Sequence, residues 1–364
     1  GTSSSTFKDA FSNVVVGSKL VSLTPSITTD SDGDRVFLGY YNLAIGDGTL
    51  VSNTKGWNNV ALGHSALYSN NTGYINIAIG AHVLEDNTTG HSNTAIGYKA
   101  LQENDVGYYN IAIGKYALQE NYDETDNTAI GYKALQLNDD GDYNIAIGKY
   151  ALQENYDGDD NIAIGYKALQ ENEYGEYNIA IGKYALQQND DADSNIAIGY
   201  KALQLNDDGD DNIAIGYQAL QLNDDGDDNI ALGYSALLNN RGDDNIALGY
   251  IALEDNTTGA DNIAMGDSAL TYNITGVNNV AIGEDALYTN TVGDHNIAIG
   301  KESGFTITTG SGNTFLGAYA NGGTGTLSNS TAIGYGASAA TSNTIQLGNS
   351  DVNLVNTSAT VSAT

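Results

Sequence analysis

A 17-residue unit repeats along almost the whole chain, and its clearest copy is NIAIGYQALQLNDDGDD at residues 212–228. Counted from the residue that opens each unit, copies begin every 17 residues from 42 to 229, and then at 245, 262, 279, 296, 313 and 330. These are eighteen copies, and the copy at 229–244 is one residue short. So short a period in a chain of 364 residues predicts one array of stacked units, each burying its apolar side against its neighbours.

The columns of the repeat show which positions are constrained. When each unit is numbered from its opening residue, position 5 is Gly in every copy and position 3 is Ala in every copy except the one with Phe315. Positions 2 and 4 are apolar, with occasional Thr at position 2. Such a segment, closed by Gly, predicts a short buried strand and then a turn that a side chain would hinder. Positions 8 and 9, usually Ala-Leu, predict a second short strand, and the Asn, Asp and Gly that follow predict turns.

Seventeen residues are too few for the helical pair of an α-solenoid, but they suffice for one coil of a β-solenoid. Strands of successive coils would then pair in parallel roughly 4.8 Å apart, and eighteen coils would extend roughly 85 Å. Identical residues would lie above one another. The Asn residues at positions 1 and 12 are therefore predicted to form amide ladders.

The strand is apolar on both sides, which a single thin coil does not require. Ile213 and Ile215 must point to the side opposite Ala214, and only one side can be the coil interior. The other side would leave a long apolar stripe in water, more than monomers normally expose. This predicts a homo-oligomer whose chains associate along the strand.

The NxAIG segments, such as residues 195–199 and 212–216, resemble the head domain of trimeric autotransporter adhesins. Similar repeats with a longer coil occur in bacterial surface fibres and bacteriophage tail fibres. The resemblance implies a trimeric, left-handed parallel β-roll. It covers roughly residues 42–348 and is closest at 330–350, where the spacing from Ser330 to Asn343 is 13 residues.

The predicted fold is therefore all-β, a parallel β-solenoid of the left-handed β-roll type with about eighteen 17-residue coils, wrapped as a homotrimer. Residues 1–41 are expected to form a cap or attachment segment, 42–329 the repeat array, and 330–364 shorter terminal coils and a tail.

Thirteen basic residues against 45 acidic ones give a formal net charge of −32, which disfavours nucleic acid as a partner and favours cations. The apolar segments are too short for membrane insertion. Together with the resemblance, this predicts an extracellular protein on a cell or virion surface, with a receptor in the host surface or matrix.

Columns of Asp in the turns form the one candidate metal site. Oxygen-rich turns suit Ca²⁺, so a calcium ladder is one interpretation and a solvated acidic turn is the other. The stretch DSDGD at 30–34 is similar to the start of a calcium loop, but Tyr41 stands at the twelfth position, where Glu would be needed. The candidate ligands are Asp208, Asp210, Asp225 and Asp227.

No catalytic constellation is recognisable, and the chain is predicted not to be an enzyme and to need no cofactor beyond possible Ca²⁺. Its four histidines occupy different columns and are expected not to meet; they are His64, His82, His91 and His295. The tripeptide Arg241–Gly242–Asp243 is interpreted as a simple turn.

Between residues 93 and 194, copies with GYK alternate with copies with GKY, so Tyr and Lys are expected to interleave and form cation–π contacts. The functional prediction is a structural and adhesive fibre that binds through repetition rather than through a pocket. A bacteriophage tail fibre that binds a receptor is one alternative. A calcium- or ice-binding solenoid is another, although the predicted outward columns lack the Thr array that ice binding would need.

Overall fold

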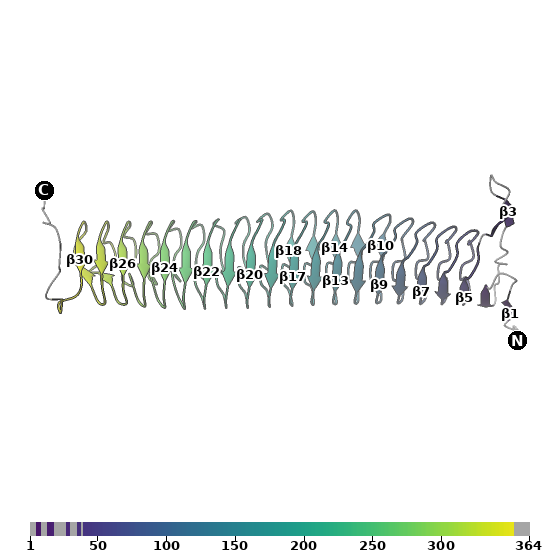
Figure 1. The fold of residues 1–364 in the computed structure, drawn as a ribbon, viewed down its shortest axis with the longest axis horizontal. Helices are drawn as coiled ribbons and strands as arrows, with labels where there is room; N and C mark the ends of the chain where they lie inside the picture. Colours follow the sequence, from purple (N-terminus) through teal and green to yellow (C-terminus); the bar gives the residue numbers. More distant parts are fainter. Residues whose placement is uncertain (1–4, 9–12, 18–26, 30–34, 38, 353–364) are drawn as a thin grey trace. The chain divides into compact units, whose positions relative to one another are not determined.

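The computed structural model describes residues 5–8, 13–17, 27–29, 35–37 and 39–352, and all regular elements within them are β-strands. The chain divides into two compact units, Gly1–Ser194 and Asn195–Thr364. Nine repeats begin in each unit, at 42 to 178 and at 195 to 330. Within each unit the coils stack by parallel strand pairing, which confirms the predicted all-β parallel solenoid (Figure 1). The domain boundaries after residues 41 and 329 stay predictions.

Positions 2–4 of every coil form the main strand ladder. Pairing is in register at the 17-residue period, so that Ala146 lies beside Ala163. In unit 1 the ladder strands are β5 (Leu43–Ile45), β6 (Val60–Leu62), β7 (Ile77–Ile79), β8 (Thr94–Ile96), β9 (Ile111–Ile113), β11 (Thr128–Ile130), β13 (Ile145–Ile147), β15 (Ile162–Ile164) and β17 (Ile179–Ile181). In unit 2 they are β19 (Ile196–Ile198), β20 (Ile213–Ile215), β21 (Ile230–Leu232), β22 (Ile246–Leu248), β23 (Ile263–Met265), β24 (Val280–Ile282), β25 (Ile297–Ile299), β26 (Thr314–Leu316), β28 (Thr331–Ile333) and β30 (Ile345–Leu347).

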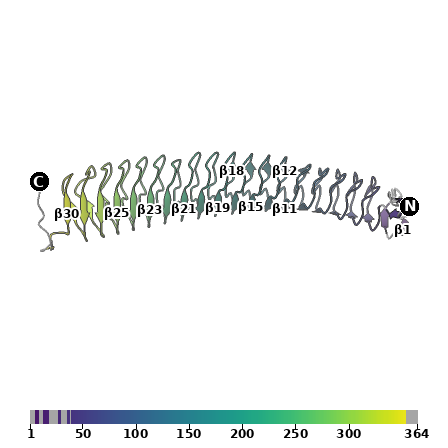
Figure 2. The same cartoon turned by 45° about the horizontal axis from the view of Figure 1, so that its top comes forward.

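A second, shorter ladder lies on the other side of the coil (Figure 2). In unit 1 it comprises β10 (Glu120–Asn121), β12 (Leu137–Asn138), β14 (Glu154–Asn155), β16 (Glu171–Asn172) and β18 (Gln188–Asn189), and in unit 2 it comprises β27 (Asn321–Gly322) and β29 (Ser338–Ala339). The remaining strands form two antiparallel pairs, β1 (Ser5–Lys8) with β2 (Val14–Gly17) and β3 (Ile27–Thr29) with β4 (Arg35–Phe37).

In unit 1 the second strand therefore lies at positions 11 and 12, and in the last coils of unit 2 it lies at positions 9 and 10. The prediction that the Ala-Leu pair at positions 8 and 9 forms it is wrong. Leu152 has φ 45°, in the left-handed region, and turns into the core. The strand follows it, where Asn155 stacks on its equivalents.

The core is a thin layer of small side chains. Position 3 and positions 8 and 9 are fully buried, as in Ala146, Ala151 and Leu152. Positions 2 and 4 point outward, and Ile147 keeps 37% of its surface exposed. A core this thin accepts Ala but not Ile at position 3, and this decides which side of the strand faces inward.

Asn ladders close each coil, as predicted. In the coil that begins at Asn144, the Nδ2 of Asn144 donates to the carbonyl of Gly158 at 2.7 Å, and its Oδ1 accepts the backbone N–H of Asn161 at 2.9 Å. At position 12, the Nδ2 of Asn155 donates both to Asn138 Oδ1 and to the same Gly158 carbonyl. Buried amides suit this position because each one donates and accepts at once.

The Gly at position 5 is required by a close approach between coils. Gly148 has φ +143°, and a Cβ on it would lie 2.2 Å from the carbonyl oxygen of Gly165 in the next coil. No other residue fits both conditions.

Two departures from the repeat compensate each other in unit 2. Phe315 replaces the position-3 Ala, and Gly304 in the preceding coil replaces the position-9 Leu. A Cβ on Gly304 would lie 3.0 Å from the Phe315 ring, so the ring occupies the volume that a Leu would fill. The shortened copy is less well compensated, because the Nδ2 of Asn229 is buried without a hydrogen-bond partner.

The ladder also extends beyond the repeats that the sequence identified. β2 pairs in parallel with β5, and Asn13 takes the position-1 role, since its Oδ1 accepts the N–H of Asn42 at 2.7 Å. At the other end, β30 aligns Ile345 with Thr331. The last spacing is therefore 14 residues, and the predicted 13 from Ser330 to Asn343 is wrong. Residues 30–34, the possible calcium-loop start, and tail residues 353–364 lie outside the described residues.

Candidate functional site

The outward side of the main ladder forms a continuous apolar surface in each unit, called here the Ile face. It consists of positions 2 and 4 of every coil, which are Ile, Leu, Val, Met or Thr and never charged. Most position-4 side chains are 36–44% exposed, as in Ile96 and Leu316. Leu62, Ile198, Leu248 and Ile282 are less exposed.

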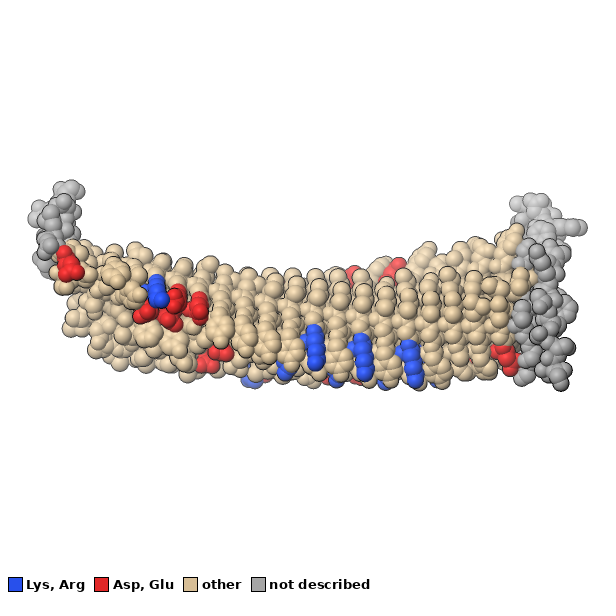
Figure 3. All heavy atoms as spheres, turned by 90° about the horizontal axis from the view of Figure 1, so that it is seen from below, with Lys and Arg blue, Asp and Glu red and all other residues tan. Residues whose placement is uncertain are grey.

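Position 6 or 7, just after the strand, carries the interleaved Tyr and Lys. In unit 1 the Nζ of Lys149 lies 5.6 Å from the ring centroid of Tyr132 and 4.9 Å from that of Tyr150, which confirms the predicted cation–π contacts. Figure 3 shows Lys and Arg side chains, in blue, spaced in a row along the coils. The Tyr rings meet edge to face, and Tyr132 and Tyr150 are 5.4 Å apart.

Positions 16 and 17, just before the strand, carry aromatic residues in the first coils of unit 1 and carboxylates in later ones. The aromatic rings stack nearly parallel with centroids 4.5–6.1 Å apart. Sequence reasoning missed this stack, although its members share the 17-residue spacing. They are Tyr40, Trp57, Tyr74, His91 and Tyr108.

The four predicted calcium ligands lie in this turn region, and the carboxylate of Asp227 has another partner there. The Oδ1 of Asp227 accepts the backbone N–H of Asp210 at 2.9 Å, and Asp227 donates its own N–H to Asp243 Oδ1 at 3.1 Å. Burial, and to a lesser extent neighbouring carboxylates, raise the pKa of Asp227, while the hydrogen bond lowers it. Asp208 and Asp225 stand two residues earlier in their coils, before the position-15 Gly.

A column of side-chain acceptors at position 16 therefore satisfies backbone N–H groups from one coil to the next. The same bond joins Thr125 to Asp142 at 2.5 Å and Asp142 to Asp159 at 2.6 Å. Within the described residues, no group of three or more His, Cys, Asp or Glu side chains is placed to hold a metal ion. The calcium site stays a prediction.

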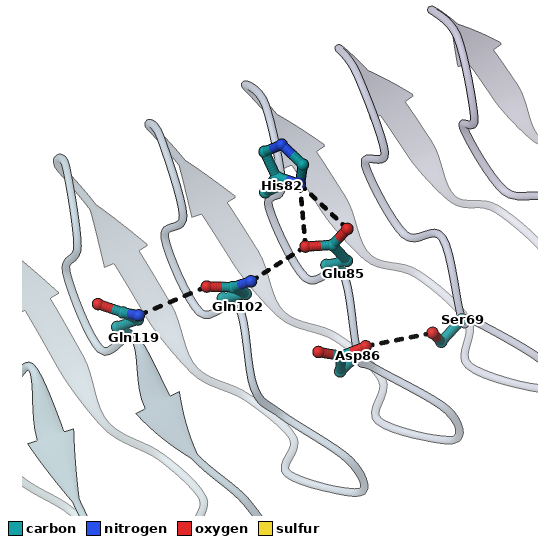
Figure 4. A network of polar contacts seen from close by, with 6 residues as sticks. All are labelled: Ser69, His82, Glu85, Asp86, Gln102 and Gln119. Atoms are coloured by element: carbon teal, nitrogen blue, oxygen red, sulfur yellow. Dashed lines mark hydrogen bonds and ion pairs between the residues drawn. The ribbon is translucent and has the colours of Figure 1, made fainter.

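The expectation that the histidines would not meet is wrong for one pair. The rings of His64 and His82 lie 5.0 Å apart, because positions 6 and 7 of successive coils are neighbours across the stack. The Nδ1 of His82 lies 3.0 Å from both carboxylate oxygens of Glu85, and Gln102 and Gln119 continue the polar chain (Figure 4). The arrangement joins coils through side chains.

Shallow grooves lie beside the position-12 Asn column, on the side opposite the Ile face. In unit 1 a groove of about 310 Å³ is lined by carboxylates, hydroxyls and one ring, including Glu103, Thr88 and Tyr122. In unit 2 a groove of about 630 Å³ includes Tyr272 and Ile274. Such groups can hydrogen-bond and pack against a polar ligand.

Glu124 departs from the Gly column at position 15. Its carboxylate is 7% exposed, and Oε2 accepts the backbone N–H of Asp123 at 2.9 Å. Burial raises the pKa of Glu124 to about 7. The side chain therefore destabilises the folded chain when ionised.

Arg241 in the shortened copy pairs with Asp224 at 2.7 Å, and Asp243 accepts the N–H of Asp227. Both charged ends of the Arg-Gly-Asp tripeptide thus have partners in the turn.

The part of the chain that the structure describes includes no helix with the length and apolarity needed to cross a membrane. No protein-family model and no curated protein matches the chain.

Proposed function

We propose that this protein is a structural and adhesive extracellular fibre that assembles as a homotrimer through the Ile face and displays its other surfaces from a bacterial cell or a virion. The observation that carries the proposal is the absence of charge at positions 2 and 4 in all eighteen copies of a chain with net charge −32. A surface in water would tolerate charge there. A surface buried between chains would not.

The energetics support association. Covering the exposed part of each Ile contributes about 1 kcal/mol, and each unit has nine coils with two such positions. The eighteen positions of one unit together contribute roughly 18 kcal/mol, which exceeds the roughly 4–15 kcal/mol that association costs in lost translational and rotational freedom. Three chains with a left-handed coil are the arrangement that the resemblance to trimeric adhesin heads implies.

The adhesive part of the proposal rests on the opposite side of the coil. The grooves beside the Asn column stay accessible when the Ile faces meet, and they recur along the coils. Weak contacts repeated along one fibre add up to useful avidity for a receptor in a host surface or matrix. Membrane insertion and nucleic-acid binding have no part in the proposal.

The ice-binding alternative receives less support. Ice binding would use a regular Thr column, but the strands of the Ile face carry Thr at four places among the described coils, Thr94, Thr128, Thr314 and Thr331.

Sedimentation equilibrium of the full chain tests the proposal, and a mass three times that of one chain is expected. The double variant Ile147→Asp, Ile164→Asp should lose assembly, whereas Tyr156→Asp on the groove side should retain it. A well-folded monomer for the unmodified chain would overturn the proposal. Electron microscopy of the native source distinguishes a cell-surface fibre from a tail fibre.

A further inference from the structure

The two edges of the Ile face carry opposite charge in unit 1. At the edge after the strand, positions 6 and 7 supply one Lys in each of six successive coils, called here the Lys edge. Its members at position 6, such as Lys115 and Lys149, are exposed, and those at position 7 are half-buried. The Lys edge comprises Lys99, Lys115, Lys133, Lys149, Lys167 and Lys183.

At the edge before the strand, positions 16 and 17 of the four coils that begin at 110, 127, 144 and 161 supply the carboxylate edge, whereas the coil that begins at 93 has Tyr108 and Tyr109 there. The members of the carboxylate edge are Asp126, Asp142, Asp159, Asp160 and Glu176. The ion pairs within the described chain involve other residues, and none of the lysines or carboxylates of these two edges lies within 4.0 Å of an opposite charge. Two complementary rows of charge thus lie side by side on one chain without meeting.

The two edges also change character within one coil of each other along unit 1, since Lys begins in the coil at 93 and the carboxylates begin in the coil at 110. In the coils that begin at 59 and 76, the edge after the strand has His64 and His82 instead of Lys, and the opposite edge has Tyr74 and His91 instead of carboxylates. A purely solvated surface gives no reason for such a correlation. In unit 2 the coil that begins at 195 has Lys201 together with Asp210 and Asp211, and in residues 212–244 Asp residues occur without Lys.

Geometry then decides the relative direction of two chains whose Ile faces meet. When the rotation axis runs along the coil stack, the edge after the strand of one chain lies against the edge before the strand of the other. When the chains run in opposite directions, like edges meet, and Lys would face Lys. Like charges along the whole edge would repel.

We propose that the chains associate in parallel, with the Lys edge of one chain against the carboxylate edge of a second copy. Each contact joins two different edges, so every chain uses both of its edges and the chains can close into a ring. Two Tyr rings contact each position-6 Lys and hold it in place, which reduces the side-chain entropy lost on pairing. This inference rests on the proposed assembly through the Ile face.

Charge reversal tests the pairing. A lysine-reversed variant carries Lys115→Glu, Lys149→Glu and Lys183→Glu, and a carboxylate-reversed variant carries Asp126→Lys, Asp160→Lys and Glu176→Lys. Asp142 and Asp159 are left unchanged because they also accept backbone N–H groups. Each variant alone should weaken chain association by at least about tenfold in sedimentation velocity at low salt. The chain that combines both variants should regain it.

The single variants Lys149→Glu and Lys55→Glu give a matched control, because Lys55 carries the same charge in a turn away from the Ile face. Lys149→Glu should weaken association more. Unchanged association of the lysine-reversed variant, or failure of the combined chain to recover, would overturn the inference while leaving the assembly intact. An unmodified chain that is monomeric would instead overturn the proposed function.

Mixing the two reversed variants adds a readout of ring size. At the changed positions one chain then has carboxylates on both edges and the other has lysines on both edges, so these positions alternate without conflict only in rings of even number. A trimeric ring keeps at least one like-charged contact, and the mixture should recover less association than the combined chain. Recovery equal to that of the combined chain would contradict an odd-numbered ring.

Discussion

Removal of one buried amide should loosen the solenoid locally. Asn144 is fully buried; its Nδ2 bonds to Gly158 at 2.7 Å, and its Oδ1 accepts the N–H of Asn161 at 2.9 Å. In the Asn144→Ala variant, Gly158 keeps its bond from Asn155, but the buried N–H of Asn161 loses its acceptor. One lost hydrogen bond and one unsatisfied buried donor together cost about 2–4 kcal/mol.

The measurement should be local, because an array of stacked coils need not unfold in one step. Hydrogen exchange followed by mass spectrometry reports the opening of each segment. The amide of Ile162, which donates to a carbonyl of the next coil, should lose protection by about 30- to 1,000-fold, which corresponds to 2–4 kcal/mol.

A matched control replaces Asn71, an exposed turn residue at position 13, by Ala. The Asn71→Ala variant should change protection in its own coil by less than about 0.5 kcal/mol. Equal effects of the two substitutions would refute the reasoning, because they would show that the buried hydrogen bonds of the position-1 Asn do not stabilise the coil.

Three further outcomes are expected. Glu124→Gly should stabilise the chain at pH 8 by about 2–3 kcal/mol. Between pH 4.5 and about 7 the unfolded chain loses the Glu124 proton while the folded chain keeps it, so the unmodified protein loses stability as the pH rises. If the melting temperature depends on pH equally in the variant and in the unmodified protein, this prediction is contradicted. Deletion of residues 212–228, one whole coil, should leave the circular dichroism spectrum and cooperative melting intact. Deletion of residues 212–219 should abolish both, since it moves the Gly and Ala columns out of register. If both deletions are tolerated equally, the alignment of these columns between coils is not what stabilises the fold. If Asp208, Asp210, Asp225 and Asp227 bind calcium, millimolar Ca²⁺ should raise the melting temperature more than Mg²⁺ does; an equal rise with sodium at matched ionic strength would show screening of repulsion instead.

The fold was predictable because the same pattern of apolar, Gly and Asn positions occurs in eighteen copies. Strand position, stacking period and Asn ladders all follow from columns that single residues could not reveal. The inward side of the strand was not predictable from hydrophobicity, because both sides are apolar; it is decided by the volume left between Ala146, Ala151 and Leu152. The second strand was misplaced because Leu152 adopts a left-handed conformation that its side chain normally disfavours.

The edges were harder to anticipate than the core. His64 and His82 stand in different columns, yet adjacent columns meet between successive coils. Column-by-column reasoning treats each position separately and overlooks such diagonal neighbours. The predicted metal ladder likewise includes Asp227, whose carboxylate instead accepts a backbone N–H from the preceding coil. Asn13 was missed because its spacing to Asn42 is 29 residues instead of 17.

The left-handed residues have a kinetic consequence. In the coil at 144–160, Tyr150, Leu152 and Asp160 all have φ between 45° and 60°, and such conformations cost about 1–2 kcal/mol each. An isolated coil would therefore be strained and would not persist in solution. A coil that adds to a finished neighbour gains the strand pairing and amide bonds that offset the strain. Folding should accordingly begin slowly at one place and then advance coil by coil, as a crystal grows from a seed, and the time to complete the array should depend mainly on forming the first template.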